Sequence, residues 1–246
     1  MSARVFVAPE RLAPGRLRLE GAEHHYLTRV RRARCGDAIT ILDGAGRAAP
    51  ATIVAIDGSA VSLEVGEVWR AAAAPPLPIA VAFAPVKGDR TEWAIQKLVE
   101  LGVSSLHPVV TERSVVALEG RRAAARIERY RAIAAEAARQ SQNPMLPRIE
   151  ELAALPDGLA ALEGAELKLA LWEQARDTPL RAVLPDRAPA DVAILVGPEG
   201  GLTPDEINEA TAAGFLAVGL GPRILRAETA AVAAAAVVQH TLGDLG

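Results

Sequence analysis

The chain has 246 residues, 50% of them hydrophobic, and a formal net charge of −3 at pH 7. This length predicts one large domain or two smaller ones, and the charge does not by itself indicate a nucleic-acid-binding protein. No apolar run reaches the length of a membrane span. The single cysteine, Cys35, excludes an internal disulfide, and the four scattered histidines have no metal-binding spacing. Without a signal-peptide pattern at its start, the sequence predicts a cytoplasmic protein that uses no metal.

The first 70 residues or so predict a β-rich domain. Short apolar runs end at glycine turns, and within the expected strand at 60–65 apolar and polar residues alternate from 61 onward. Such short, regularly spaced strands are typical of a small barrel. The expected strands are 4–7, 37–44, 51–58 and 60–65.

An arginine-rich segment lies between the first two of these strands. Residues 22–34 begin with a stretch that fits a short helix and end with the arginines Arg29, Arg31, Arg32 and Arg34. Taken alone, such a segment is more often a solvated face that keeps a domain soluble. The functional alternative is a phosphate-binding patch of a nucleic-acid-binding module, in which His24 and His25 stack on bases.

The remainder of the chain alternates strands with helices. A proline- and alanine-rich stretch at 71–78 predicts a linker or domain boundary. Beyond it, buried strands are expected at 79–83, 105–110, 167–171, 192–196 and 215–218. Between and after them, helices are expected from a cap at Asp89 to Gly102, over 121–140, from 204 to Gly214, and from about 227 to 243. This alternation predicts an α/β fold, a mostly parallel sheet covered by helices on both faces.

Two of these strands end in glycine–proline turns that lead directly into helices. Gly197–Gly201 follows the strand at 192–196, and Thr203, Pro204 and Glu206 then form a helix-start pattern with a capping box. The second turn, 219–226, follows the strand at 215–218. One such turn alone is more often only a tight turn. Because ligands of open α/β sheets bind at the carboxyl ends of strands, two of them indicate a binding site.

Several common types of ligand-binding and catalytic site are excluded because their sequence motifs are missing. The chain lacks the GxGxxG dinucleotide pattern, the GxxxxGK[ST] phosphate loop and the GxSxG nucleophile turn. A pocket made of backbone and apolar side chains remains, with Glu199, Arg226 and Glu228 near it. Such a pocket suits a flat heteroaromatic ligand.

A set of motifs in order along the chain resembles one known family. The motifs are Lys87-Gly88-Asp89-Arg90, Gln96-Lys97, Glu100-Leu101-Gly102-Val103, Thr111-Glu112-Arg113-Ser114, Gly197-Pro198-Glu199-Gly200-Gly201 and the run from Leu220 to Ala230. They resemble the RsmE family of 16S ribosomal RNA (uracil-N3)-methyltransferases, in the SPOUT superfamily, over nearly the whole chain. The resemblance implies a PUA-like, RNA-binding β-barrel at 1–72 and a SPOUT methyltransferase domain with a deep trefoil knot at 73–246, in a homodimer. One departure is Asn143, where the family usually has arginine.

The resemblance also implies a reaction and a set of site residues. The reaction is methylation of N3 of a uridine in 16S rRNA, with S-adenosylmethionine as cofactor, no metal, and ribosomal RNA or the small ribosomal subunit as partner. The implied cofactor-binding residues are Leu195, Gly197, Pro198, Glu199, Gly200, Gly201, Leu220, Gly221, Ile224, Leu225, Thr229 and Ala230. The expected RNA-binding residues are Arg29, Arg31, Arg32, Arg34, Lys87, Arg90 and Arg113.

Arg226 is the expected catalytic residue. Its guanidinium stays charged and can donate to the uracil oxygen on which charge develops as N3 loses its proton. Glu228 is the second candidate, as a proton acceptor. The alternative is that Arg226 only pairs with Glu199 or Glu228 to hold the turn.

Two other functions stay open at this point. One is a methyltransferase that acts on another RNA, and the other is a non-catalytic, dimeric RNA-binding protein. The last helix, nearly all alanine and valine, must be buried on more than one side, either within one subunit or against a second copy.

Overall fold

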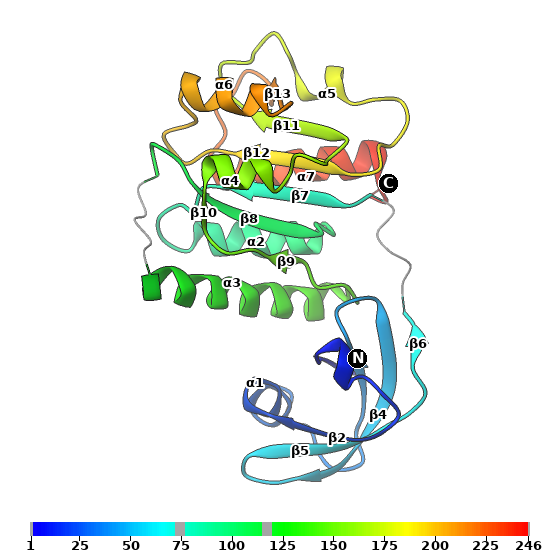
Figure 1. Ribbon diagram of the computed structural model, residues 1–246. Coiled ribbons are helices and arrows are strands. Elements are labelled where there is room, and N and C mark those ends of the chain that lie inside the picture. Colours follow the sequence, from blue (N-terminus) through cyan, green and yellow to red (C-terminus); the bar gives the residue numbers. More distant parts are fainter. Residues whose placement is uncertain (1, 72–76, 115–119, 246) are drawn as a thin grey trace. The chain divides into compact units, whose positions relative to one another are not determined.

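The computed structural model describes residues 2–71, 77–114 and 120–245, and the chain divides into two compact units (Figure 1). The first unit contains Met1–Ala74 and Ala138–Leu146, and the second contains Pro75–Ala137 and Pro147–Gly246. The linker expected at 71–78 falls mostly on residues 72–76, outside the described residues. The domain boundary between 72 and 73 therefore stays a prediction.

A curved sheet forms the first unit. Its strands pair in the order β1-β3-β4-β5-β2, with β6 beside β4; β1 and β3 run parallel and the other pairs antiparallel. The strands are β1 (Ala3–Phe6), β2 (Gly15–Glu20), β3 (Ala38–Leu42), β4 (Arg47–Ile56), β5 (Ala60–Val65) and β6 (Trp69–Arg70). Alternate side chains of β1 to β5 meet in one apolar core. Strands β2 and β6 were not predicted from the sequence.

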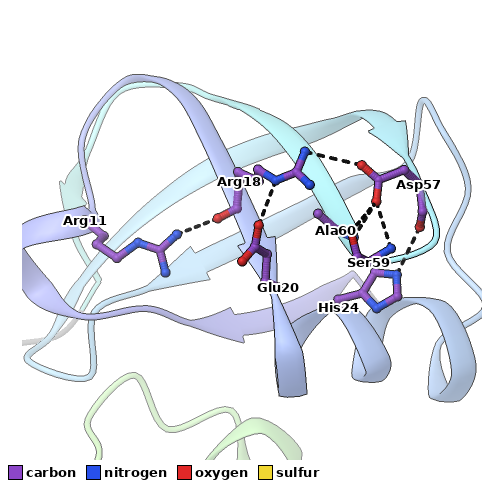
Figure 2. Close-up of polar contacts among 7 residues, drawn as sticks. All are labelled: Arg11, Arg18, Glu20, His24, Asp57, Ser59 and Ala60. Atoms are coloured by element: carbon purple, nitrogen blue, oxygen red, sulfur yellow. Dashed lines mark hydrogen bonds and ion pairs between the residues drawn. The ribbon is translucent and has the colours of Figure 1, made fainter.

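The arginine-rich segment follows β2. It begins as α1 (Gly21–His25) and continues as a π-helical turn, Tyr26–Val30. His24 Nε2 lies 3.2 Å from the carbonyl oxygen of Asp57 in the β4–β5 turn (Figure 2), and base stacking by His24 and His25 stays a prediction. Backbone N–H groups of Ser59 and Ala60 donate to the Asp57 carboxylate and hold its pKa at about 2. The turn therefore fixes the position of α1.

The last turn of α3 (Gly120–Ser141) also belongs to the first unit. There the Arg139 guanidinium pairs with Glu23 and lies 4.7 Å from the centroid of the Tyr26 ring. Only 11% of the Arg139 side chain is exposed, so this ion pair and cation–π contact are well shielded from water. Asn143, at the position where the resembled family usually has arginine, accepts a hydrogen bond from the Met145 N–H at 2.9 Å.

A parallel sheet forms the second unit, as predicted. The strand order is β10-β8-β7-β12-β11-β13, with β9 beside β8, and every one of these pairs is parallel. The strands are β7 (Ile79–Phe83), β8 (Ser105–Val110), β9 (Arg148–Ile149), β10 (Ala153–Ala154), β11 (Leu167–Leu171), β12 (Val192–Val196) and β13 (Leu216–Val218). Strand β12 is buried at all five positions, which explains its uninterrupted apolar run.

Helices cover both faces of this sheet (Figure 1). The helices α4 (Leu155–Ala160) and α6 (Pro204–Ala212) share an apolar cluster with Ala82 and Leu195 on one face. On the other face, α2 (Arg90–Glu100) packs against α7 (Ala227–Leu242), and Tyr130 of α3 lies against Phe83 with 6.3 Å between ring centroids. The short helices α4 and α5 (Leu180–Val183) and the strands β9 and β10 were not predicted.

The helix-start predictions have different outcomes. The capping box of α6 is confirmed, because the Thr203 side chain accepts from the Glu206 N–H and the Glu206 carboxylate accepts from the Thr203 N–H. The cap predicted at Asp89 is only half right. Asp89 occupies the position before α2, but its side chain makes no capping hydrogen bond, because its backbone (φ −91°, ψ 0°) is not in the extended conformation of an ordinary cap.

One buried titratable group lies within the sheet. His107 on β8 is 8% exposed, and its Nε2 lies 3.0 Å from Ser105 Oγ. Burial lowers the pKa of His107 below its ordinary 6.5, an effect that Glu150 opposes and Arg148 reinforces. The folded protein therefore favours the neutral imidazole.

We expect this histidine to make stability depend on pH. Its contribution is complete above about pH 6.5, where the side chain is neutral in both states, and is lost as the pH falls, because the unfolded chain takes up the proton first. The loss from one group is at most about 1.4 kcal/mol per pH unit. The free energy of unfolding of the wild type and of His107→Gln, measured with urea between pH 7.5 and 5, tests this dependence. The variant should have the flatter profile, and two parallel profiles would contradict the assignment.

Candidate functional site

Three turns meet at one edge of the parallel sheet. Strands β12, β11 and β13 are adjacent, and their last residues are in register: Leu171 lies opposite Val196 on one side and Val218 on the other. The turns that follow the three strands therefore leave the sheet at the same level. Both predicted glycine–proline turns are among them, and the third is the segment after β11.

A cavity of about 460 Å³ lies among these turns, within the size range of small-molecule sites. Its floor is apolar, and six charged side chains surround it. The lining residues are Arg90, Leu171, Trp172, Glu173, Arg176, Val196, Gly197, Pro198, Glu199, Gly200, Gly201, Leu202, Val218, Leu220, Gly221, Pro222, Arg223, Ile224, Leu225, Arg226, Ala227 and Ala230.

The structure brings together most of the predicted cofactor residues. Gly197 to Gly201, Leu220, Gly221, Ile224, Leu225 and Ala230 all line the cavity, and so does Arg226. Leu195 and Thr229 do not line it. Neither does Glu228, whose carboxylate lies at a second, mainly apolar cavity of about 20 Å³ between α2 and the start of α7. Its Oε2 is buried and has no hydrogen-bond partner among the described residues.

The segment after β11 was missing from the sequence-based site. Trp172, Glu173 and Arg176 line the cavity, and the buried indole Nε1 of Trp172 has no hydrogen-bond partner in the described part of the chain. The sequence predicts a strand that ends at Leu171 but not that this strand lies between β12 and β13. Without this order of the strands, the sequence could not place Trp172, Glu173 and Arg176 at the cavity.

The first turn, Gly197–Gly201, requires its glycines. The N–H of Gly201 donates to the Pro198 carbonyl at 2.9 Å, and Gly201 has φ +69°, a conformation that side chains with a Cβ rarely adopt. A Cβ on Gly197 would lie 2.8 Å from Leu202 Cγ. The backbone is thereby free to approach a ligand directly.

Two arginines from other segments hold this turn. Arg90, at the start of α2, pairs with Glu199, and Arg113 Nη1 donates to the Gly200 carbonyl at 2.7 Å. Both had been predicted to bind RNA, as had Lys87, which is exposed. Arg226 is exposed and forms no ion pair within residues 2–71, 77–114 and 120–245, so the structure does not contain the predicted alternative pairing with Glu199 or Glu228.

The second turn crosses the segment after β11. The N–H of Gly219 donates to the Thr178 carbonyl at 3.0 Å, and the Leu180 N–H donates to the Gly219 carbonyl at 2.9 Å. A Cβ on Gly219 would lie 2.6 Å from the Ala175 carbonyl oxygen. Gly219 is therefore a point at which two backbone segments pack in direct contact.

The other predicted RNA-binding residues lie in the first unit. Arg29, Arg31, Arg32 and Arg34 are all exposed. Arg32 has φ +51°, unusual for a residue other than glycine. Within the described residues, no group of three or more His, Cys, Asp or Glu side chains could hold a metal ion. None of the helices described is long and apolar enough to cross a bilayer.

Comparisons with known proteins support the resemblance. Residues 73–239 match the RNA methyltransferase domain family, and residues 19–66 match the RNA methyltransferase PUA domain. Ribosomal RNA small subunit methyltransferase E from Synechocystis is 34% identical, over 98% of this chain and 78% of that protein. The enzyme of the same name from Bacillus subtilis is 31% identical, over 90% and 89%.

Solved structures agree with these relatives. A putative methyltransferase from Legionella pneumophila, in complex with the bound cofactor SAM, has a TM-score of 0.92 and 32% identity, with all of both chains covered. A ribosomal RNA small subunit methyltransferase E from Neisseria gonorrhoeae bound to S-adenosyl methionine has a TM-score of 0.89 and 32% identity, again with all of both chains covered.

We expect Gly219→Ala to destabilise the second unit. The added methyl group would lie 2.6 Å from the Ala175 carbonyl oxygen, in the segment whose Thr178 and Leu180 backbone groups bond to Gly219. Such overpacking costs about 2 kcal/mol. Gly164→Ala is the matched control, because a Cβ there meets nothing within 4 Å. Thermal unfolding should show a lower midpoint for Gly219→Ala alone. Equal midpoints would mean that the crossing tolerates a side chain.

Proposed function

Because the chain belongs to the family of ribosomal RNA small subunit methyltransferases E, we propose that it methylates N3 of a uridine in 16S ribosomal RNA, with S-adenosylmethionine as methyl donor. The observation that carries the proposal is the cavity at the ends of β11, β12 and β13, walled by two glycine-rich backbone turns. A non-catalytic RNA-binding protein has no use for such a cavity.

The residues around the cavity fit this cofactor. The apolar floor, with Leu171, Val196 and Val218, suits the adenine ring, and the open backbone of Gly197–Gly201 offers hydrogen-bonding groups at close range. Glu173 supplies negative charge for the cationic part of the cofactor, and Arg176 and Arg223 supply positive charge for its carboxylate. When bound, the cofactor supplies an activated methyl group on a sulfonium.

Arg226 is the residue that we assign to the uracil ring. It lies at the cavity, immediately before α7, and its guanidinium is not occupied by an ion pair in the described residues. A charged, forked donor there stabilises negative charge on a uracil oxygen while N3 loses its proton. Glu228 is a weaker candidate for the proton acceptor, since it lines the smaller cavity and not this one.

The finer features of the fold belong to the same proposal. The hydrogen bonds between Gly219 and the Thr178–Leu180 backbone, followed by the return of α7 to β12 and β7 at the centre of the sheet, support a trefoil-knotted SPOUT fold.

Trp93 on α2 and Val237 on α7 are 45% and 39% exposed, on two helices that pack together. These exposed apolar side chains support a homodimer. The exposed arginines at 29, 31, 32 and 34 are assigned to the phosphates of ribosomal RNA, in the cytoplasm where ribosomes assemble.

The proposed activity is tested by mass spectrometric mapping of 16S rRNA. Undermethylated small subunits are incubated with the protein and isotopically labelled S-adenosylmethionine. We expect one labelled uridine, methylated at N3. Label on another base, or on a different RNA offered in the same reaction, would replace this proposal with the alternative of another RNA target.

Arg226→Lys separates a catalytic role from a structural one. The lysine keeps the positive charge but loses the forked donor geometry. If Arg226 stabilises the developing anion, the single-turnover methylation rate falls by about 10²–10³, while cofactor affinity and the melting temperature stay close to those of the wild type. A variant with a normal single-turnover rate would remove Arg226 from the mechanism.

A further inference from the structure

The Thr111–Ser114 turn, which follows β8, is closed by its own hydrogen bonds. The Thr111 N–H donates to Ser114 Oγ at 2.9 Å, and the Ser114 N–H donates to the Thr111 carbonyl at 3.0 Å. The two side-chain oxygens lie 3.0 Å apart, and Thr111 is 6% exposed. The turn is thus a preformed unit anchored in the core.

Glu206 connects this turn to the cavity wall. Its side chain is buried at 8% exposure, and its two carboxylate oxygens accept from different segments. Oε2 accepts from the Thr203 N–H at 2.8 Å, which is the capping box of α6, and Oε1 accepts from the Glu112 N–H at 2.7 Å. A glutamine would complete the capping box equally well. The cap alone therefore does not require a carboxylate, whereas accepting both hydrogen bonds on separate oxygens does.

Arg113 makes the second connection. Its Nη1 donates to the Gly200 carbonyl at 2.7 Å, and its side chain lies along the turn, since a Cβ on Gly200 would be 3.3 Å from both Arg113 Cβ and Cδ. Consecutive residues of the Thr111–Ser114 turn thus hold the Gly197–Gly201 turn through Gly200 and hold the start of α6 through Glu206.

We infer that Glu206 and Arg113 are positioning residues, which fix the Gly197–Gly201 turn in the conformation that binds S-adenosylmethionine. Glycine turns have many accessible backbone conformations, and a turn that must first be ordered binds its ligand more weakly. Neither side chain needs to touch the reacting atoms. The inference rests on the proposed function, since it takes the cavity as the cofactor site.

Glu206→Gln tests the connection with little other change. The glutamine oxygen can still accept from the Thr203 N–H, but the amide nitrogen cannot accept from the Glu112 N–H. We expect the Kd for S-adenosylmethionine, measured by isothermal titration calorimetry, to rise about tenfold, as for the loss of one charge-assisted hydrogen bond. At saturating cofactor the single-turnover rate should return to within about threefold of the wild-type rate.

Two further variants complete the experiment. Ile207→Val, in the same helix and 5% exposed, removes one buried methylene without touching either connection. It should lower the melting temperature but leave the Kd within about twofold. Arg113→Ala should raise the Kd for S-adenosylmethionine as Glu206→Gln does. In the double variant the Kd should rise by less than the product of the two single-variant factors, because both residues act on the same turn.

The outcomes separate this inference from the proposed function. If the wild type binds S-adenosylmethionine and both Glu206→Gln and Arg113→Ala bind it equally well, the two residues only stabilise the fold and the inference is overturned. If Glu206→Gln does not fold, the Kd of Arg113→Ala for S-adenosylmethionine tests the inference by itself. A wild-type protein that binds no S-adenosylmethionine overturns the proposed function, and this inference with it.

Discussion

The shared register of three parallel strands is the constraint on which the site depends. Strands β12, β11 and β13 are neighbours, and Val196, Leu171 and Val218 end them at one level. Strand β12 is buried at all five positions, and β11 pairs with β12 on one side and with the edge strand β13 on the other up to these last residues. Beyond them, three turns with different sequences project side by side. The cavity is the space that they enclose.

Glycine-containing turns form part of the lining of this cavity, and their glycines have a physical reason. Gly201 at φ +69° and Gly219 against the Ala175 carbonyl allow main chains to approach where a Cβ would not fit. Charged side chains lie around the opening. The cost of such a wall is conformational freedom, and the structure offsets it by anchoring the Gly197–Gly201 turn through Arg90 and Arg113, and the adjoining start of α6 through Glu206. The proposed function therefore assigns binding, ring stabilisation and positioning to different residues.

Local sequence patterns predicted where helices and strands lie better than they predicted which strands are adjacent in the sheet. The runs at 79–83 and 192–196 and the capping box at Thr203 carry their signals in adjacent residues, and the structure contains them as predicted. Strand β2 was missed because arginines alternate with leucines at Gly15–Glu20, in a segment without a long apolar run. Sheet order and pairing across more than 80 residues are not local. Hence the sequence did not predict that Trp172 lines the cavity or that Arg90 and Arg113 contact its wall.

The family resemblance supplied what periodicity cannot. It named the activity, the cofactor and the trefoil knot, and the comparisons confirm the family. The residue roles come from position instead: Arg226 lies at the cavity, while Glu228, two residues further on, lies at the smaller cavity behind the helix start. A helix turns by about 100° per residue, so neighbouring residues at its start face different surroundings.

Hydrogen exchange of the backbone amides, measured by mass spectrometry with and without S-adenosylmethionine, tests the central claim most directly. The claim is that the turns at the ends of β12 and β13 hold the cofactor with their backbone. Peptides that cover 196–202 and 218–227 should exchange more slowly when the cofactor is present, while peptides from β3 to β5 should be unchanged. Protection confined to the first unit, or no protection in either turn at saturating cofactor, would contradict the account.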